Sequence, residues 1–214
     1  METSATRRNR LDDLLRQFDE SMIYSNLDAE IEFNRVVDDH ARGLPTADRV
    51  RLFCVRERST RALESGRAGK LATMDQFLGE TAVAMRPLEG LAVLLARSMY
   101  WSVQAYRQYL RGQFEDARNA LRRANIADLR LMKQGVAIMA MHRLQLVHNL
   151  ARIEIKRGDV NLASDYARAV IDHLRGLETA DLPLAGPWQP AQLESCSLEV
   201  VAAMIRQIRG LVLN

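Results

Sequence analysis

Apolar residues recur three and four positions apart along nearly the whole chain, with polar residues between them. This spacing matches the α-helical turn of about 3.6 residues and places the apolar side chains on one face. No segment alternates apolar and polar residues in the manner of a strand, so no strands are expected. The pattern predicts helices at about residues 9–24, 26–42, 46–65, 68–86, 87–111, 114–133, 136–157, 160–175 and 190–209.

Three glycines mark a regular interval along this series. Gly66, Gly112 and Gly158 fall 46 residues apart, each at the expected end of one helix and just before the next. Because glycine takes a left-handed backbone without a Cβ clash, each is expected to end its helix. The short connections predict four antiparallel hairpins, at about 9–42, 46–86, 88–133 and 136–175, followed by a C-terminal helix at about 190–209.

Other turn residues set the remaining boundaries. Thr46 is expected to cap the third helix. Pro87 and Pro190 suit the first turn of a helix and are expected to open the fifth and the last helices. Gly210 is expected to end the last helix, and Leu177–Gln189 is the one sizeable loop. No low-complexity linker divides the chain, so we expect one domain over residues 1–214.

The third and fourth hairpins share a pattern of small and aromatic residues. In the third it comprises Trp101, Ala105, Tyr109, Gly112, Phe114, Ala117 and Ala124. In the fourth it comprises Leu150, Ala151, Ile155, Gly158, Val160 and Ala163. This pattern resembles the tetratricopeptide repeat (TPR), clearly so over about residues 98–172. The second hairpin is a degenerate copy that keeps Gly66.

The resemblance implies a right-handed α-solenoid in which hairpins stack into one core and leave a long exposed surface. Ala105 and Ala117 would lie where the helices of a hairpin cross, because larger side chains would force them apart. Trp101, Tyr109 and Phe114 would fill the spaces between pairs. The period of 46 residues exceeds the usual value of about 34, and the proline that usually closes each repeat is missing, so the helices are expected to be longer.

In TPR arrays the first helix of each hairpin lines a concave groove that holds a partner segment. The resemblance places Met99, Ser102, Val103, Tyr106, Tyr109 and Leu110 there in the third hairpin, with Tyr106 and Tyr109 as aromatic contacts. In the fourth hairpin it places Gln145, His148, Asn149, Arg152 and Lys156. An asparagine amide can hold a peptide backbone, and the two cations can meet a carboxylate. The alternative is that Asn149 and Arg152 are only solvated helix surface.

Charge adds a possible acidic partner to this picture. Lysine occurs only at positions 70, 133 and 156, so 27 of the 30 basic residues are arginine, and 27 acidic residues are interleaved with them. The formal net charge is +3. No secretory signal and no apolar run of about 18 residues is evident, so a cytoplasmic protein without a membrane anchor is expected. Cys54 and Cys196 lie far apart and are expected to be core residues.

Enzymatic motifs are weak throughout the sequence. His40, His142, His148 and His173 form no metal-binding spacing, and there is no phosphate-binding glycine loop or nucleophile motif. Asp38, Asp39 and His40 fit a polar helix end better than a catalytic cluster. We therefore expect that the protein is not an enzyme and that it binds no metal and no cofactor.

The leading hypothesis is a bacterial-type adaptor or regulator that binds a protein or peptide in the groove without turnover. A nucleic-acid-linked regulator is the second reading, based on Arg7, Arg8, Arg10 and the isoelectric point near 9.1. An all-α enzyme with a site assembled from distant residues is a third.

Two apolar segments leave a choice between core and partner surface. Met132, Met139 and Met141 form one, which we expect to be buried between hairpins or to meet a partner. The C-terminal helix is the other, with Leu193, Cys196, Leu198, Val200, Val201, Met204, Ile205 and Ile208. This helix predicts either a cap on the array or a surface that pairs two chains into a homodimer.

Overall fold

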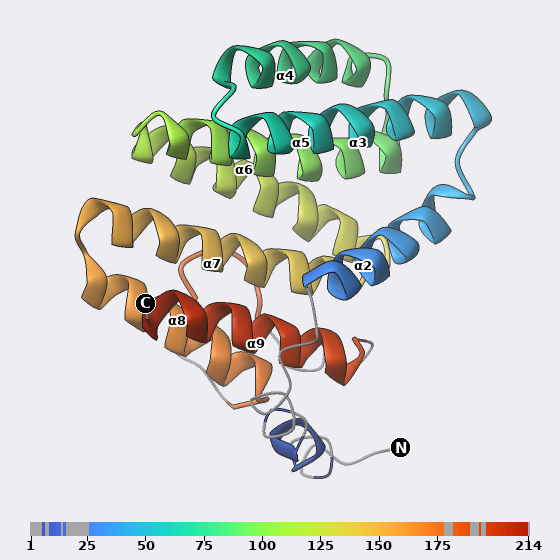
Figure 1. Ribbon diagram of the computed structural model, residues 1–214. Helices are drawn as coiled ribbons and strands as arrows, with labels where there is room; N and C mark the ends of the chain where they lie inside the picture. The colour runs from blue at the N-terminus through green and yellow to red at the C-terminus, as the bar shows by residue number, and fades with distance from the viewer. Residues whose placement is uncertain are drawn as a thin grey trace. The chain divides into compact units, whose positions relative to one another are not determined.

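The structure, a computed structural model, describes residues 6, 9–13, 15, 26–177, 182–188, 193 and 196–213. Side chains are described for the same residues except 26–33, 212 and 213. Helices make up most of this part of the chain, and it contains no strand (Figure 1). The all-α expectation is confirmed for the described residues.

Helices with described bounds are α2 (Asn26–Ala41), α3 (Thr46–Arg67), α4 (Leu71–Met85), α5 (Gly90–Leu110), α6 (Phe114–Lys133), α7 (Met139–Arg157), α8 (Val160–Leu174) and α9 (Leu198–Leu213). Residues 9–13 are also helical, as expected, while most of the rest of that first helix lies outside the described residues. The chain forms two compact units. The central unit is Val37–Met139, and the terminal unit is Met1–Val36 with Ala140–Asn214. A single domain over 1–214 stays a prediction.

The expectation that Gly66 ends α3 is wrong. The helix continues to Arg67, and the left-handed residue that ends it is Gly69, with φ of 72°. The Lys70 N–H donates to Ser65 O at 2.8 Å, the closing bond of a Schellman turn. Gly66 is instead buried inside the helix, where close neighbours, and not backbone conformation, require glycine. Gly112 and Gly158 have φ of 72° and 88° and end α5 and α7 as expected.

Three helices begin about three residues later than the sequence predicts, and the first of them is α4, which begins at Leu71 and not at about residue 68. Pro87 does not open α5, because Leu88 is buried in the connection and its N–H donates to Met85 O at 3.1 Å; α5 then begins at Gly90. Likewise α7 begins at Met139, after a turn in which Gly135 has φ of 89°.

The last helix is also displaced from its predicted range of about 190–209. Its described part begins at Leu198, where Ser197 Oγ accepts from Val200 N at 3.3 Å, and Pro190 lies outside the described residues. Gly210 does not end it, because its φ is not left-handed and helical backbone continues to Leu213. A glycine inside a helix costs only about 1 kcal/mol relative to alanine, so neighbouring packing can carry the helix past it.

Helix α5 contacts α3, α4 and α6 and is the centre of the central unit (Figure 1). Alanines line the contact with α6: Ala117 and Ala124 are fully buried, and Ala105 nearly so, as the small-residue pattern predicts. These side chains let the helices approach closely. Ser98 Oγ donates to the buried Asp128 at 2.5 Å and adds a polar link between α5 and α6. Trp101, expected in the core, is only half-buried.

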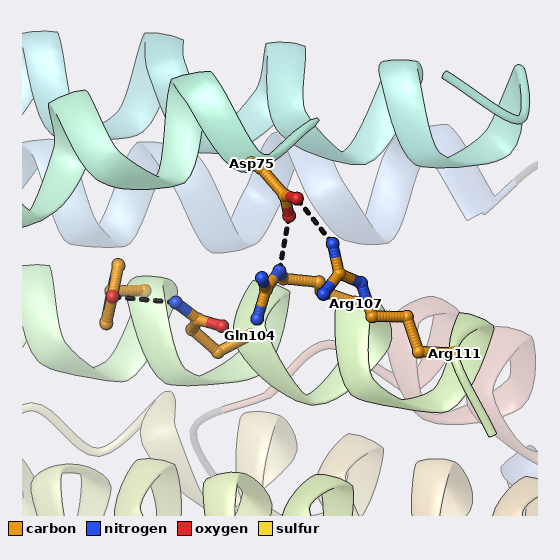
Figure 2. A network of polar contacts seen from close by, with 5 residues as sticks. Asp75, Gln104, Arg107 and Arg111 are labelled. Atoms are coloured by element: carbon orange, nitrogen blue, oxygen red, sulfur yellow. Dashed lines mark hydrogen bonds and ion pairs between the residues drawn. The ribbon is translucent and has the colours of Figure 1, made fainter. Parts of the chain in front are cut away.

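An apolar cluster joins α3, α4 and α5. Its buried residues are Ala62, Met74, Leu78 and Val103, and Tyr106 and Leu110 pack against it from α5. Beside it, Asp75 of α4 lies between Arg107 and Arg111 of α5 (Figure 2). Arg107 Nε donates to Asp75 Oδ1 at 2.5 Å, and Arg111 binds the other carboxylate oxygen. The hydrogen bond from Arg107 is the main reason that the pKa of the Asp75 carboxyl lies below its usual value.

The terminal unit contains a fully buried arginine. Arg143 of α7 donates to Pro187 O at 2.8 Å and to Ala185 O at 3.2 Å, and its guanidinium carbon lies 3.8 Å from the centre of the Trp188 ring. Trp188 in turn meets His173 of α8 edge to face. These contacts hold residues 185–188 against α7 and α8, so the expected loop has a fixed path where it is described.

Helix α9 contacts α8 within the same unit. The apolar side chains that suggested a pairing surface are mostly buried within the chain: Leu193, Cys196, Leu198, Val200, Val201, Ile205 and Ile208. This burial favours the cap over the pairing surface, and a homodimer through this helix stays a prediction. Met139 and Met141 are buried as well, and Met132 is half-buried.

We expect Gly66→Ala to lower the free energy of unfolding by about 1–2 kcal/mol. Its Cβ would lie 2.9 Å from Met74 Sδ and 3.1 Å from both Leu110 and Tyr106 side-chain atoms. Gly79→Ala is the matched control, because Gly79 lies in α4 with nothing near its Cβ position. This exchange should raise the free energy of unfolding by about 0.5–1 kcal/mol. Urea denaturation measures both. A Gly66→Ala variant as stable as Gly79→Ala would contradict the close packing.

Arg143→Met should lower the free energy of unfolding by about 2–4 kcal/mol, because two backbone carbonyls lose a charged donor. Arg168→Met on the exposed surface of α8 is the control and should change stability by less than about 0.5 kcal/mol. Thermal and urea unfolding followed by circular dichroism compare the two. Equal stability of both variants would show that Arg143 does not hold the 185–188 segment.

Candidate functional site

A hollow of about 200 Å³ opens on the central unit where the last turn of α2 meets α3 and α5. Its floor is apolar, formed by Val37, Ala41 and Leu52, which are buried, and by Met99 of α5. Phe53 forms a wall. Its polar lining consists of Asp38, Arg42, Arg49 and Arg56. The hollow therefore combines an apolar base with a rim of three guanidinium groups and one carboxylate.

The sequence between α2 and α3 places these residues together. The Leu44 N–H donates to Ala41 O at 3.0 Å, and Pro45 then takes extended backbone with φ of −52° and ψ of 144°. The chain thereby turns into α3, whose first residue is Thr46. Thr46 is not the cap that the sequence predicts, because Pro45 holds the cap position and no side chain caps the helix.

Two of the three rim arginines are already paired with carboxylates. Arg56 Nη1 lies 2.6 Å from Asp38 Oδ1, and Arg42 Nη2 lies 3.2 Å from Asp39 Oδ1. Arg49 differs: its Nη2 donates to Thr46 Oγ1 at 3.3 Å, and it has no carboxylate partner in the part of the chain that the structure describes. Arg49 is therefore the guanidinium most available to an incoming anion.

Exposed apolar side chains stand beside this rim. Phe53 is 54% exposed and Val50, one turn earlier on α3, is 58% exposed. The Arg56 guanidinium carbon lies 5.7 Å from the centre of the Phe53 ring, a distance at which a cation and a ring attract. A partner that covers both side chains would gain apolar burial next to Arg49 and Arg56.

The predicted groove residues of α5 lie partly inside the fold. Val103 is buried, and Tyr106 packs against the α3–α4–α5 cluster, which leaves only part of its ring exposed. Tyr106 and Tyr109 stack with ring centres 6.3 Å apart. Met99 is the one residue of the predicted α5 set that lines the hollow.

The other predicted residues lie on α7 in the terminal unit, so the two sets belong to different units. Gln145 Nε2 lies 2.9 Å from His148 Nδ1, which an amide nitrogen can only reach as a donor. His148 is only 4% exposed, whereas Asn149 and Arg152 are half-buried and Lys156 is exposed. Burial, together with the smaller effect of the nearby charge of Arg152, lowers the pKa of His148 to about 4. The binding role of these residues stays a prediction.

The polar triplet at the end of α2 has structural contacts. Asp38 and Asp39 form the arginine pairs described above, and His40 is half-buried. Among the described residues no three His, Cys, Asp or Glu side chains gather closely enough to hold a metal ion. No helix in this part of the chain is both long and apolar enough to cross a membrane. Cys196 is buried, and Cys54 is half-buried.

Sequence reasoning missed the α3 residues of the hollow. The buried positions of α3 are Leu52, Val55, Ser59, Ala62 and Gly66, spaced three and four apart. Val50 and Phe53 fall off this stripe, so large apolar residues at exposed positions were the available signal. The hollow also needs the turn between α2 and α3, which spacing alone does not define.

The stability of the protein should fall as the pH falls from about 6.5 to 4. In this range the unfolded chain binds a proton at His148 and the folded chain does not, so protonation favours unfolding, by roughly 3 kcal/mol in total. Burial, with the nearby charge of Arg143, also lowers the pKa of His173, so it acts in the same direction. Urea denaturation at several pH values measures this.

His148→Gln should flatten that pH dependence, because glutamine does not titrate, and a further His173→Gln exchange should flatten it more. An unchanged slope in His148→Gln would contradict the neutral, buried state of this imidazole. Stability at pH 8 serves as the reference, since both imidazoles are neutral there in either state of the chain.

Comparison of this chain with protein-family models, with curated proteins and with solved structures finds no match.

Proposed function

We propose that this chain is a non-enzymatic scaffold, an adaptor or regulator that binds a protein or peptide segment. The hollow is the observation that carries the proposal. Its apolar floor suits a hydrophobic side chain, and its arginine rim suits a neighbouring carboxylate. The expected occupant is an extended partner segment in which acidic residues flank an apolar one.

We further propose that the helices of the central unit are arranged as antiparallel, TPR-like hairpins of a right-handed solenoid. The contacts of α5 support this: it meets both α3 and α4 of the preceding pair as well as its own partner α6. Stacked hairpins have this pattern of neighbours, because each pair buries its apolar face against the next. The helices are long for such repeats, with 22 residues in α3 and 21 in α5.

This arrangement would place the hollow on the binding face. In TPR arrays the first helices of the hairpins line the concave surface, and here those helices are α3 and α5. The hollow draws Arg49, Leu52, Phe53 and Arg56 from α3 and Met99 from α5. The proposed site therefore lies nearer the N-terminus than the sequence alone suggests.

The test uses the full chain and a fluorescein-labelled extended peptide with a central leucine flanked by glutamates. Phe53→Ala and Arg49→Gln should each weaken binding about tenfold, because each removes about 1–2 kcal/mol of apolar or charge-assisted contact. Fluorescence anisotropy measures the affinity. A second peptide has glutamine in place of glutamate. It should bind the native chain more weakly than the glutamate peptide does, whereas Arg49→Gln should bind the two peptides with equal affinity.

Two exposed positions away from the hollow provide matched controls. Arg61→Gln on α3 makes the same change as Arg49→Gln, and Val83→Ala on α4 truncates another exposed apolar side chain; both should leave the affinity unchanged. If the peptide binds but the hollow variants bind it as well as the controls do, the hollow is not the site. If the extended acidic peptide does not bind the native chain, the proposed function is wrong in this form.

A further inference from the structure

The outer face of α6 carries cations without carboxylates over its last turns. Arg122, Arg123, Arg130 and Lys133 are exposed there, and Ile126 in their middle is 50% exposed. With about 100° of rotation per residue, these five side chains leave the helix within an arc of about 100°. We call them the α6 stripe. It extends over about 16 Å, at a rise of about 1.5 Å per residue.

The cations of the stripe have few partners in the described structure. Arg122 Nη1 donates to Asn119 Oδ1 at 2.8 Å, and the Arg123 guanidinium carbon lies 4.5 Å from the centre of the Trp101 ring. Among the described residues none of the four cations pairs with a carboxylate. The only acid in residues 119–133 is Asp128, which is buried and accepts from Ser98. The positive charge of the stripe is therefore uncompensated.

The first turn of α6 shows the contrast. There Glu115 and Asp116 are exposed, and Arg118 Nη1 lies 2.9 Å from Glu115 Oε1. Acidic and basic side chains thus lie together where the helix begins, whereas the exposed charges of its last turns are all positive. A surface of one charge with an apolar residue at its centre is complementary to a partner that places opposite charges around an apolar side chain.

We propose that the α6 stripe is a docking surface for an acidic amphipathic helix of a partner protein. Arg122 and Arg130 are eight residues apart, so two carboxylates seven or eight residues apart on that helix would meet them, and an apolar side chain midway between these carboxylates would cover Ile126. Arginine binds carboxylates through two parallel hydrogen bonds, which fixes the orientation of the partner. The contact of Arg123 with Trp101 limits the movement of that guanidinium, so less entropy is lost on binding.

The exposed isoleucine decides between protein and nucleic acid. A phosphate backbone would satisfy the four cations but would leave Ile126 against charged oxygen atoms. A helix with one apolar side chain among its acids buries Ile126 and pairs the cations at the same time. The length of the stripe also fits, since three turns of helix cover about 16 Å.

This second surface goes beyond the proposed function, because it shares no residue with the hollow. The probe is a fluorescein-labelled helical peptide that carries glutamates three and four residues to either side of a central leucine, all on one face. We expect it to bind the full chain with an affinity that falls as salt is added. The Arg122→Glu/Arg130→Glu double variant should bind at least tenfold more weakly, and Ile126→Asp about fivefold more weakly.

Matched controls make the same changes elsewhere. Arg67→Glu/Arg168→Glu alters the net charge equally at exposed positions of α3 and α8, and Val83→Asp places an acid at an exposed apolar position of α4. These variants should bind as the native chain does, and Arg49→Gln in the hollow should too. Circular dichroism establishes that each variant is folded.

Three results would overturn the proposal. The acidic helix fails to bind the native chain; it binds the double variant as well as the charge-matched control; or a labelled DNA duplex binds more tightly than the peptide and loses affinity in the double variant. The last result would assign the stripe to nucleic acid. None of them bears on the hollow, whose variants are tested with a different peptide.

Discussion

The absence of a side chain at residue 66 is the constraint on which the central unit depends. Met74 from α4 and Tyr106 and Leu110 from α5 occupy the space where a Cβ would stand. They can meet there only because α3 presents bare backbone at this turn. The approach of α3 to α5 then fixes where Leu52 of α3 and Met99 of α5 lie in the floor of the hollow. A packing requirement in the core thus positions a surface feature several turns away.

The sequence predicts the helices well and the reasons for their ends less well. Periodicity alone locates α6 at 114–133, because its alanine ridge, buried at Ala117 and Ala124, follows one face of the helix without interruption. Glycine is needed either where the backbone is left-handed or where a neighbouring helix packs closely, and a single sequence does not separate these two needs. The sequence therefore predicts that Gly66 ends α3, although this glycine is required by close packing. Leu88 shows the same limit, since the spacing of apolar residues does not reveal that it is buried in the connection before α5, which begins only at Gly90.

The candidate sites were harder to predict because their residues become neighbours only in the folded chain. Arg49, Phe53 and Met99 lie up to 50 positions apart in the sequence. The α6 stripe is local, yet its charge imbalance emerges only when Asp128 is found buried against Ser98 and Glu115 paired with Arg118.

Arg143 illustrates the opposite case. An arginine in a helix is expected at the surface, and here it is buried between backbone carbonyls and an indole ring. The many arginines of this chain therefore have three roles: a buried donor to backbone carbonyls, partners in ion pairs, and unpaired positive charges on the surface.

The two tryptophans of the chain are divided between its two units. Trp101 lies in the central unit beside Arg123, and Trp188 lies in the terminal unit beside Arg143. Each indole lies close to a guanidinium group of the same unit, and this contact is lost when that unit unfolds. The protein thus contains one tryptophan per unit, and exchanging either indole for phenylalanine leaves a tryptophan emission signal that reports the melting of a single unit.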